Sequence, residues 1–134
     1  MKNFPLDVLL FVVVLLPTSA PANSCSAKRI KVQQVCGIVV DLRGIPIPGA
    51  SLQVMNEKGA ATMPAVLSDG DGRFFLTDVE KGDAFLATTA QYFDRLKWPL
   101  KITGKTNGTQ CKKPIFIHLS IATGMGCGSW VDWK

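Results

Sequence analysis

Few residues in this chain have the types and spacing that catalysis requires. His118 is the only histidine and Tyr92 the only tyrosine, so neither a site of several histidines nor an iron centre of two histidines and two tyrosines can be assembled. Serine-hydrolase chemistry is not indicated either, because residues 126–130 read G-C-G-S-W and lack the G-x-S-x-G pattern. A lone histidine on a strand is more often a packed or surface residue than a catalyst. We therefore expect no catalytic residue.

One acidic segment has the outline of a calcium loop. Asp69, Asp71 and Glu80 fall at its positions 1, 3 and 12, but Arg73 stands where an oxygen ligand is needed and Phe74 where the sharp turn needs glycine. The segment therefore predicts a turn. Zinc is disfavoured as well, because the chain has no C-x-x-C pair and a single histidine. We expect no metal and no cofactor.

The amino-terminal residues 1–22 have the features of a secretory signal peptide. Lys2 supplies a positive end, an apolar stretch covers residues 8–16, and Ala20 and Ala22 precede the expected cleavage site. Nine apolar residues fall well short of the roughly 20 that span a bilayer, so a retained anchor is the weaker alternative. The predicted location is secreted or periplasmic, with no stable membrane span after signal removal. Asn107 begins a glycosylation sequon whose use depends on the host.

Four cysteines follow the signal, and an even number in an oxidising compartment predicts two disulfides. Three connectivities are open, although pairing Cys36 with Cys111 would tie the start of the first strand to the approach of the last. The candidates are Cys25, Cys36, Cys111 and Cys127.

The remaining sequence predicts an all-β fold in one domain. A polar lead-in (residues 23–34) precedes a domain at residues 35–121, and a Gly/Trp-rich tail (residues 122–134) follows it. Short runs with alternating apolar residues are separated by Gly, Pro and Asp turns, which is typical of a small antiparallel Greek-key β-sandwich of about seven strands. The clearest strand lies within residues 93–102, where one face carries Leu96, Trp98, Leu100 and Ile102 and the other carries Arg95, Lys97, Pro99 and Lys101. Pro99 favours an edge position for it.

A scattered set of turn and core residues resembles the carboxypeptidase regulatory-like domain, a transthyretin-like module. The resemblance covers about half of the mature chain and implies a β-sandwich without a reaction of its own. The sequence departs from it at Ala84 and Tyr92, and the segment from Cys111 to Lys134 is not explained by it. The matching positions are Gly37, Asp41, Gly44, Pro46, Pro48, Gly49, Ala50, Val54, Ser68, Asp69, Asp71, Gly72, Arg73, Phe74, Leu76, Gly82, Leu86, Ala90 and Phe93.

Two surfaces are candidates for binding. Arg95, Lys97 and Lys101 form an outward basic stripe, which Lys105, Lys112 and Lys113 could extend and which could meet an anionic partner, although lysines also keep an edge strand soluble and unpaired. Trp130 and Trp133 could stack on sugar rings or pack over the open end of the sandwich. Nucleic acid is not expected, since a secreted chain without stacked aromatic residues lacks the usual platform.

The sequence as a whole predicts a secreted, non-catalytic binding or structural module, monomeric when alone, with an unknown protein or glycan partner. One alternative is a carbohydrate-binding module that uses the two C-terminal tryptophans. A second is a small hydrolase, which would need His118 beside an acidic residue such as Asp83 or Asp94. A third is an adaptor that docks onto an envelope complex.

Overall fold

The computed structural model describes residues 27–104, 110–122 and 128–133, and in these ranges the regular structure consists of strands alone. No helix in these ranges has the length and apolar character needed to cross a membrane. The strands are β1 (Ile30–Val32), β2 (Val35–Asp41), β3 (Ser51–Met55), β4 (Val66–Leu67), β5 (Arg73–Leu76), β6 (Gly82–Thr89), β7 (Leu96–Ile102), β8 (Ile115–Leu119) and β9 (Trp130–Trp133).

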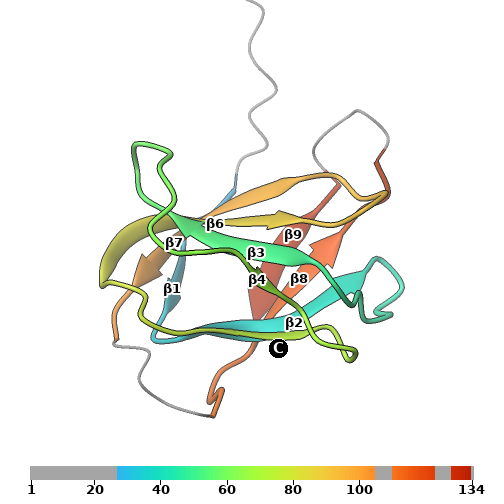
Figure 1. Ribbon diagram of the computed structural model, residues 1–134, viewed down its shortest axis with the longest axis horizontal. Helices are drawn as coiled ribbons and strands as arrows, with labels where there is room; N and C mark the ends of the chain where they lie inside the picture. The colour runs from blue at the N-terminus through green and yellow to red at the C-terminus, as the bar shows by residue number, and fades with distance from the viewer. Residues whose placement is uncertain (1–26, 105–109, 123–127, 134) are drawn as a thin grey trace, which may run out of the picture.

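The strands form two sheets that pack face to face (Figure 1). One sheet has five strands in the order β1-β7-β6-β3-β4, and the other has four in the order β5-β2-β8-β9. Each strand turns alternate side chains into the space between the sheets. The core there includes Val32, Val35, Val39, Leu52, Val54, Phe74, Leu76, Leu86, Leu100, Ile102, Ile115, Ile117, Leu119 and Val131.

The predicted all-β sandwich is confirmed, and so is the disulfide between Cys36 and Cys111. The two cysteines lie 75 residues apart in sequence, with Cα atoms 5.8 Å apart. Cys25 and Cys127, the other disulfide candidates, lie outside the described residues, as do the signal-peptide segment and Asn107. The bridge ties β2 to the segment that leads into β8.

The segments outside the predicted domain contribute a strand each. β1 arises from the polar lead-in and forms one edge of the five-stranded sheet. β9 arises from the Gly/Trp-rich tail and forms one edge of the four-stranded sheet. Both are short, so neither produces a long alternating pattern. Val32 and Val131 are the side chains that they bury.

Two neighbouring pairs of strands are parallel, β1 with β7 and β2 with β8, whereas the sequence predicted an antiparallel arrangement throughout. Alternation within a strand is the same for either direction of its neighbour, so the pattern could not distinguish them. The edge position that Pro99 suggested for β7 holds in part, because β1 lies outside β7 but covers only Leu100–Ile102 and leaves residues 96–99 as an edge among the described strands. Pairing with β1 begins at Leu100, immediately after the proline.

Gly37 allows the close approach of β2 and β8. It pairs with Ile115, and a Cβ added at Gly37 would collide with the carbonyl group of Ile115. The obstacle is backbone in a buried strand and cannot swing aside. Gly37 is therefore required for the central pairing of the four-stranded sheet.

We expect Gly37→Ala to lower the free energy of unfolding by about 3 kcal/mol, because the methyl group forces β2 and β8 apart. Urea denaturation followed by circular dichroism would measure it. Gly70→Ala is the matched control, since nothing lies within 4 Å of a Cβ built at Gly70. Equal stabilities of the two variants would show that β2 and β8 can separate without cost.

Removal of the disulfide by the double substitution Cys36→Ala/Cys111→Ala is expected to lower stability by about 4 kcal/mol. A crosslink between residues 75 positions apart restricts the unfolded chain strongly. Chemical denaturation of the double variant and the parent protein under oxidising conditions measures the difference. An unchanged midpoint would contradict a stabilising role of this bridge.

Candidate functional site

The outer face of the five-stranded sheet carries the predicted basic stripe. Lys97 and Lys101 alternate with the buried residues of β7 and are exposed. Across the sheet, Lys101 pairs in register with Lys31 of β1 on one side and with Asp83 of β6 on the other. Arg95 is exposed and immediately precedes β7.

Phe85 of β6 organises the cations on this face. The Lys97 ammonium lies 4.6 Å from the centroid of the Phe85 ring, and the Arg29 guanidinium lies 6.0 Å from it. Arg29 also donates a hydrogen bond to the Leu100 carbonyl at 3.0 Å and pairs with Asp83 at 3.3 Å. The cation–π contacts hold the basic groups over the sheet. The Arg29–Asp83 pair is half exposed and contributes little to stability.

Arg29 and Lys31 were not recognised as part of this surface from sequence. They lie in the lead-in, and only the parallel pairing of β1 with β7 brings them beside Lys97 and Lys101. β1 covers β7 at Lys101, whereas residues 96–99, which include Lys97, have no outer neighbour among the described strands. Protection of a free edge therefore does not explain Lys101.

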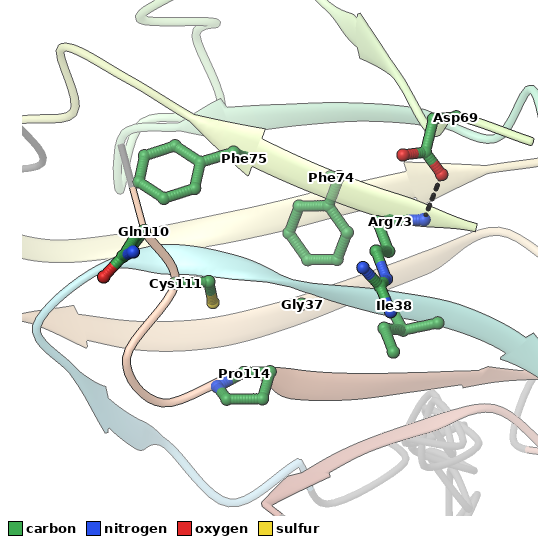
Figure 2. A pocket seen from close by; sticks show the side chains of 9 residues that line it. All are labelled: Gly37, Ile38, Asp69, Arg73, Phe74, Phe75, Gln110, Cys111 and Pro114. Carbon is green, nitrogen blue, oxygen red and sulfur yellow. Dashed lines mark hydrogen bonds between the residues drawn. The ribbon is translucent and has the colours of Figure 1, made fainter. Parts of the chain in front are cut away.

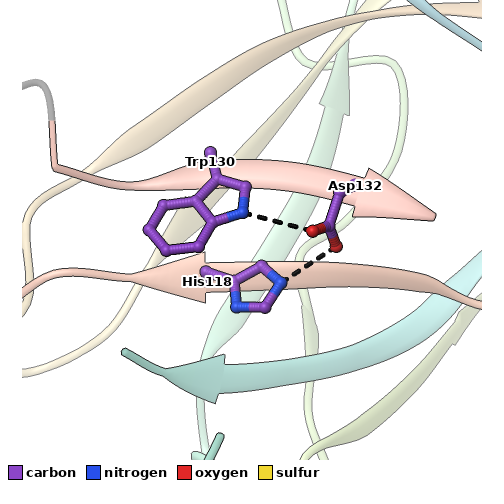
Figure 3. Close-up of polar contacts among 3 residues, drawn as sticks. All are labelled: His118, Trp130 and Asp132. Atoms are coloured by element: carbon purple, nitrogen blue, oxygen red, sulfur yellow. Dashed lines mark hydrogen bonds and ion pairs between the residues drawn. The ribbon is translucent and has the colours of Figure 1, made fainter. Parts of the chain in front are cut away.

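His118 belongs to a polar and aromatic cluster on the four-stranded sheet (Figure 3). Its Nε2 atom lies 2.9 Å from Asp132 Oδ1, and its ring stacks on Trp130 with centroids 4.5 Å apart and an interplanar angle of 12°. Trp130 Nε1 donates to Asp132 Oδ2 at 3.3 Å. The antiparallel register places His118 opposite Trp130, so the cluster fastens β9 onto β8.

The hydrolase alternative predicts an acidic residue, such as Asp83 or Asp94, beside His118. The partner observed is Asp132, whereas Asp83 pairs with Arg29 on the other sheet and the Asp94 backbone amide donates to the Ser120 carbonyl. The contact with Asp132 and the stack on Trp130 were not predicted from the sequence. Nothing in residues 118–133 signals this contact before the pairing of β8 with β9 is known.

The two tryptophans face in opposite directions. Trp130 lies on the same face of β9 as Asp132, whereas Trp133 lies on the opposite face, because residues three apart in a strand point to opposite sides. Each is partly exposed, Trp130 to 39% and Trp133 to 44%. They do not form one flat platform for a sugar chain.

The described part of the chain contains several surface hollows. One, of about 580 Å³, lies beside β2 and β5 and includes Asp69, Arg73 and Cys111 (Figure 2). Asp69 Oδ1 accepts hydrogen bonds from the backbone amides of Asp71 and Arg73, both at 2.9 Å. This carboxylate closes a turn. Among the described residues, no group of three or more His, Cys, Asp or Glu side chains is placed to hold a metal ion.

A second hollow, of about 610 Å³, lies at the edge where β1 approaches β9. Lys31, Lys112, Lys113 and Trp133 are among its lining residues. It adjoins the basic face through Lys31. Sequence reasoning missed Lys112 and Lys113 as partners of Trp133, because they are brought together only by the disulfide and by the pairing of β8 with β9.

Comparisons with known proteins give no family. No family model matches the chain. No curated protein matches it either. Among solved structures, it is similar to BcpA, the major pilin subunit of Bacillus cereus, with 13% identity, a TM-score of 0.48, and coverage of 65% of this chain and 27% of that one.

A second similar structure is 3-chlorocatechol 1,2-dioxygenase from Rhodococcus opacus 1CP. The identity is 14% and the TM-score 0.38, over 84% of this chain and 62% of the dioxygenase. The chain thus spans less than two thirds of the length of either protein.

Proposed function

We propose that this protein is a secreted, non-catalytic recognition module that binds an acidic partner through the outer face of its five-stranded sheet. In this proposal it is a carboxypeptidase regulatory-like sandwich that acts through its surface. The observation that carries the proposal is the grouping of Arg29, Lys31, Lys97 and Lys101 on one face, with Asp83 as the acidic residue paired among them.

The arrangement of these cations supports recognition of an anion. Arg29 and Lys97 are already held over the Phe85 ring in the free protein. Their side chains therefore lose less conformational entropy when a partner binds. A positive face on a chain of net charge +5 attracts anionic partners over about one Debye length, roughly 8 Å at physiological salt. Binding would therefore be fast and sensitive to ionic strength.

The Cys36–Cys111 disulfide supports an extracellular or periplasmic location, because such bridges persist in oxidising compartments. The non-catalytic part of the proposal draws on the cluster around His118. Its polar contacts join β8 to β9, which is a sufficient structural explanation for a histidine that pairs with an aspartate.

The test is the charge-reversal variant Lys97→Glu/Lys101→Glu. We expect it to weaken binding to poly-L-glutamate at low ionic strength about tenfold and to reduce the salt dependence of the affinity. Isothermal titration calorimetry over a series of salt concentrations would measure both quantities.

The matched control is Arg43→Glu/Lys58→Glu, which changes the net charge equally at two exposed positions in other turns. It should retain most of the affinity. If both double variants lose the same affinity, the net charge alone attracts the polymer and the face has no specific role.

A further inference from the structure

The hollow between β1 and β9 combines cations with an exposed aromatic ring. Lys31, Lys112 and Lys113 contribute three ammonium groups, and Trp133 contributes an indole of which 44% is exposed. No carboxylate of the described residues lines this hollow. The hollow beside β2 and β5 includes one aspartate and one arginine, Asp69 and Arg73, and so does a third hollow beside the end of β8, with Asp41 and Arg43. The lining charges of these two hollows therefore balance.

The walls of the hollow are fixed by contacts of the main chain. The Lys112 amide donates to Gln34 Oε1 at 3.0 Å, and Gln34 Nε2 donates to the Gln110 carbonyl at 3.1 Å. The adjacent Cys111 is bridged to β2 by the disulfide. The Lys112–Lys113 segment is therefore held from both sides, although its side chains extend into solvent.

The opposite wall is held in the same manner. The Thr103 amide donates to the Val32 carbonyl at 2.8 Å, which keeps the end of β7 against β1. Trp133 pairs in register with Ile115, a fully buried residue of β8. The indole is thus carried by a strand that is paired along its length.

We propose that this hollow, from here on the Trp133 groove, binds an acidic saccharide: a sugar ring that carries a carboxylate or a sulfate. The inference rests on the proposed function above and names its ligand class. The apolar C–H face of a pyranose covers the indole of Trp133, and its acidic substituent meets the ammonium groups of Lys112 and Lys113. A volume of about 610 Å³ is within the usual range of small-ligand sites and accommodates a short stretch of a polysaccharide.

The groove favours this ligand over other anions. A free phosphate or an acidic peptide side chain would satisfy the lysines but would leave the indole uncovered, and a flat lipid surface would not enter a concave site. Lys31 also lies on the outer face beside Lys101, so an anionic polymer that leaves the groove continues over the basic face. The two surfaces together form one path for an extended polyanion.

The experiment compares polygalacturonate with poly-L-glutamate, two carboxylate polymers that differ in the sugar ring. We expect the parent protein to prefer polygalacturonate and Trp133→Ala to lose about tenfold in affinity for it, with the affinity for poly-L-glutamate unchanged. Trp130→Phe is the matched control, because it changes the other tryptophan of the same strand, on the opposite face, and keeps an aromatic ring to stack on His118. It should keep the preference.

Lys112→Gln/Lys113→Gln serves as a second variant in case Trp133→Ala weakens β9, which thermal denaturation would detect. It removes the charges without altering the strand and should reduce binding of polygalacturonate more than that of its neutral methyl ester. Dextran sulfate compared with carboxymethyl dextran, two acids on the same sugar backbone, distinguishes sulfate from carboxylate as the preferred acid.

Equal affinities of the parent protein for the sugar and peptide polymers would overturn the saccharide inference. An unchanged preference in both variants would overturn the placement in the Trp133 groove. In either case, a salt-dependent loss of binding in Lys97→Glu/Lys101→Glu leaves the proposed function standing. If no variant alters binding to any of these polymers, both proposals fail.

Discussion

The structure depends on the parallel pairing of β2 with β8, which in turn depends on a glycine. Neighbouring parallel strands need a long connection between them. Here the connection from β2 to β8 includes every strand of the five-stranded sheet except β1. Gly37 lets the two backbones meet at Ile115, and the disulfide one residue earlier holds the approach to β8 against β2. The position of Lys112 and the support for Trp133 both follow from that contact.

The pairing of the two terminal strands explains how the surfaces arise. β1 runs alongside the end of β7 and adds Arg29 and Lys31 to the two lysines of that strand. β9 extends the other sheet and carries one tryptophan on each face. The basic face and the groove are therefore assembled by strands from the two ends of the described chain around a core that the middle of the sequence forms.

Local sequence patterns were sufficient for the central strands of the core but not for β1, β9 and these surfaces. Alternation in residues 96–102 predicted which side chains of β7 are buried, since that pattern depends on the strand alone. The strands of three and four residues at Ile30 and Trp130 are too short to alternate detectably. The contact between His118 and Asp132 and the grouping of Lys112 with Trp133 depend on register between strands, which no single segment encodes.

The location of the groove at the sheet edges has a thermodynamic consequence. Short terminal strands separate from a sandwich at a lower free energy than its central strands, so β1 and β9 can detach while the interior stays packed. A ligand that bridges them would close these local openings and would slow amide exchange at the two rims far more than in β2 or β6. A ligand bound in the Trp133 groove would thus stabilise β1 and β9 against local unfolding.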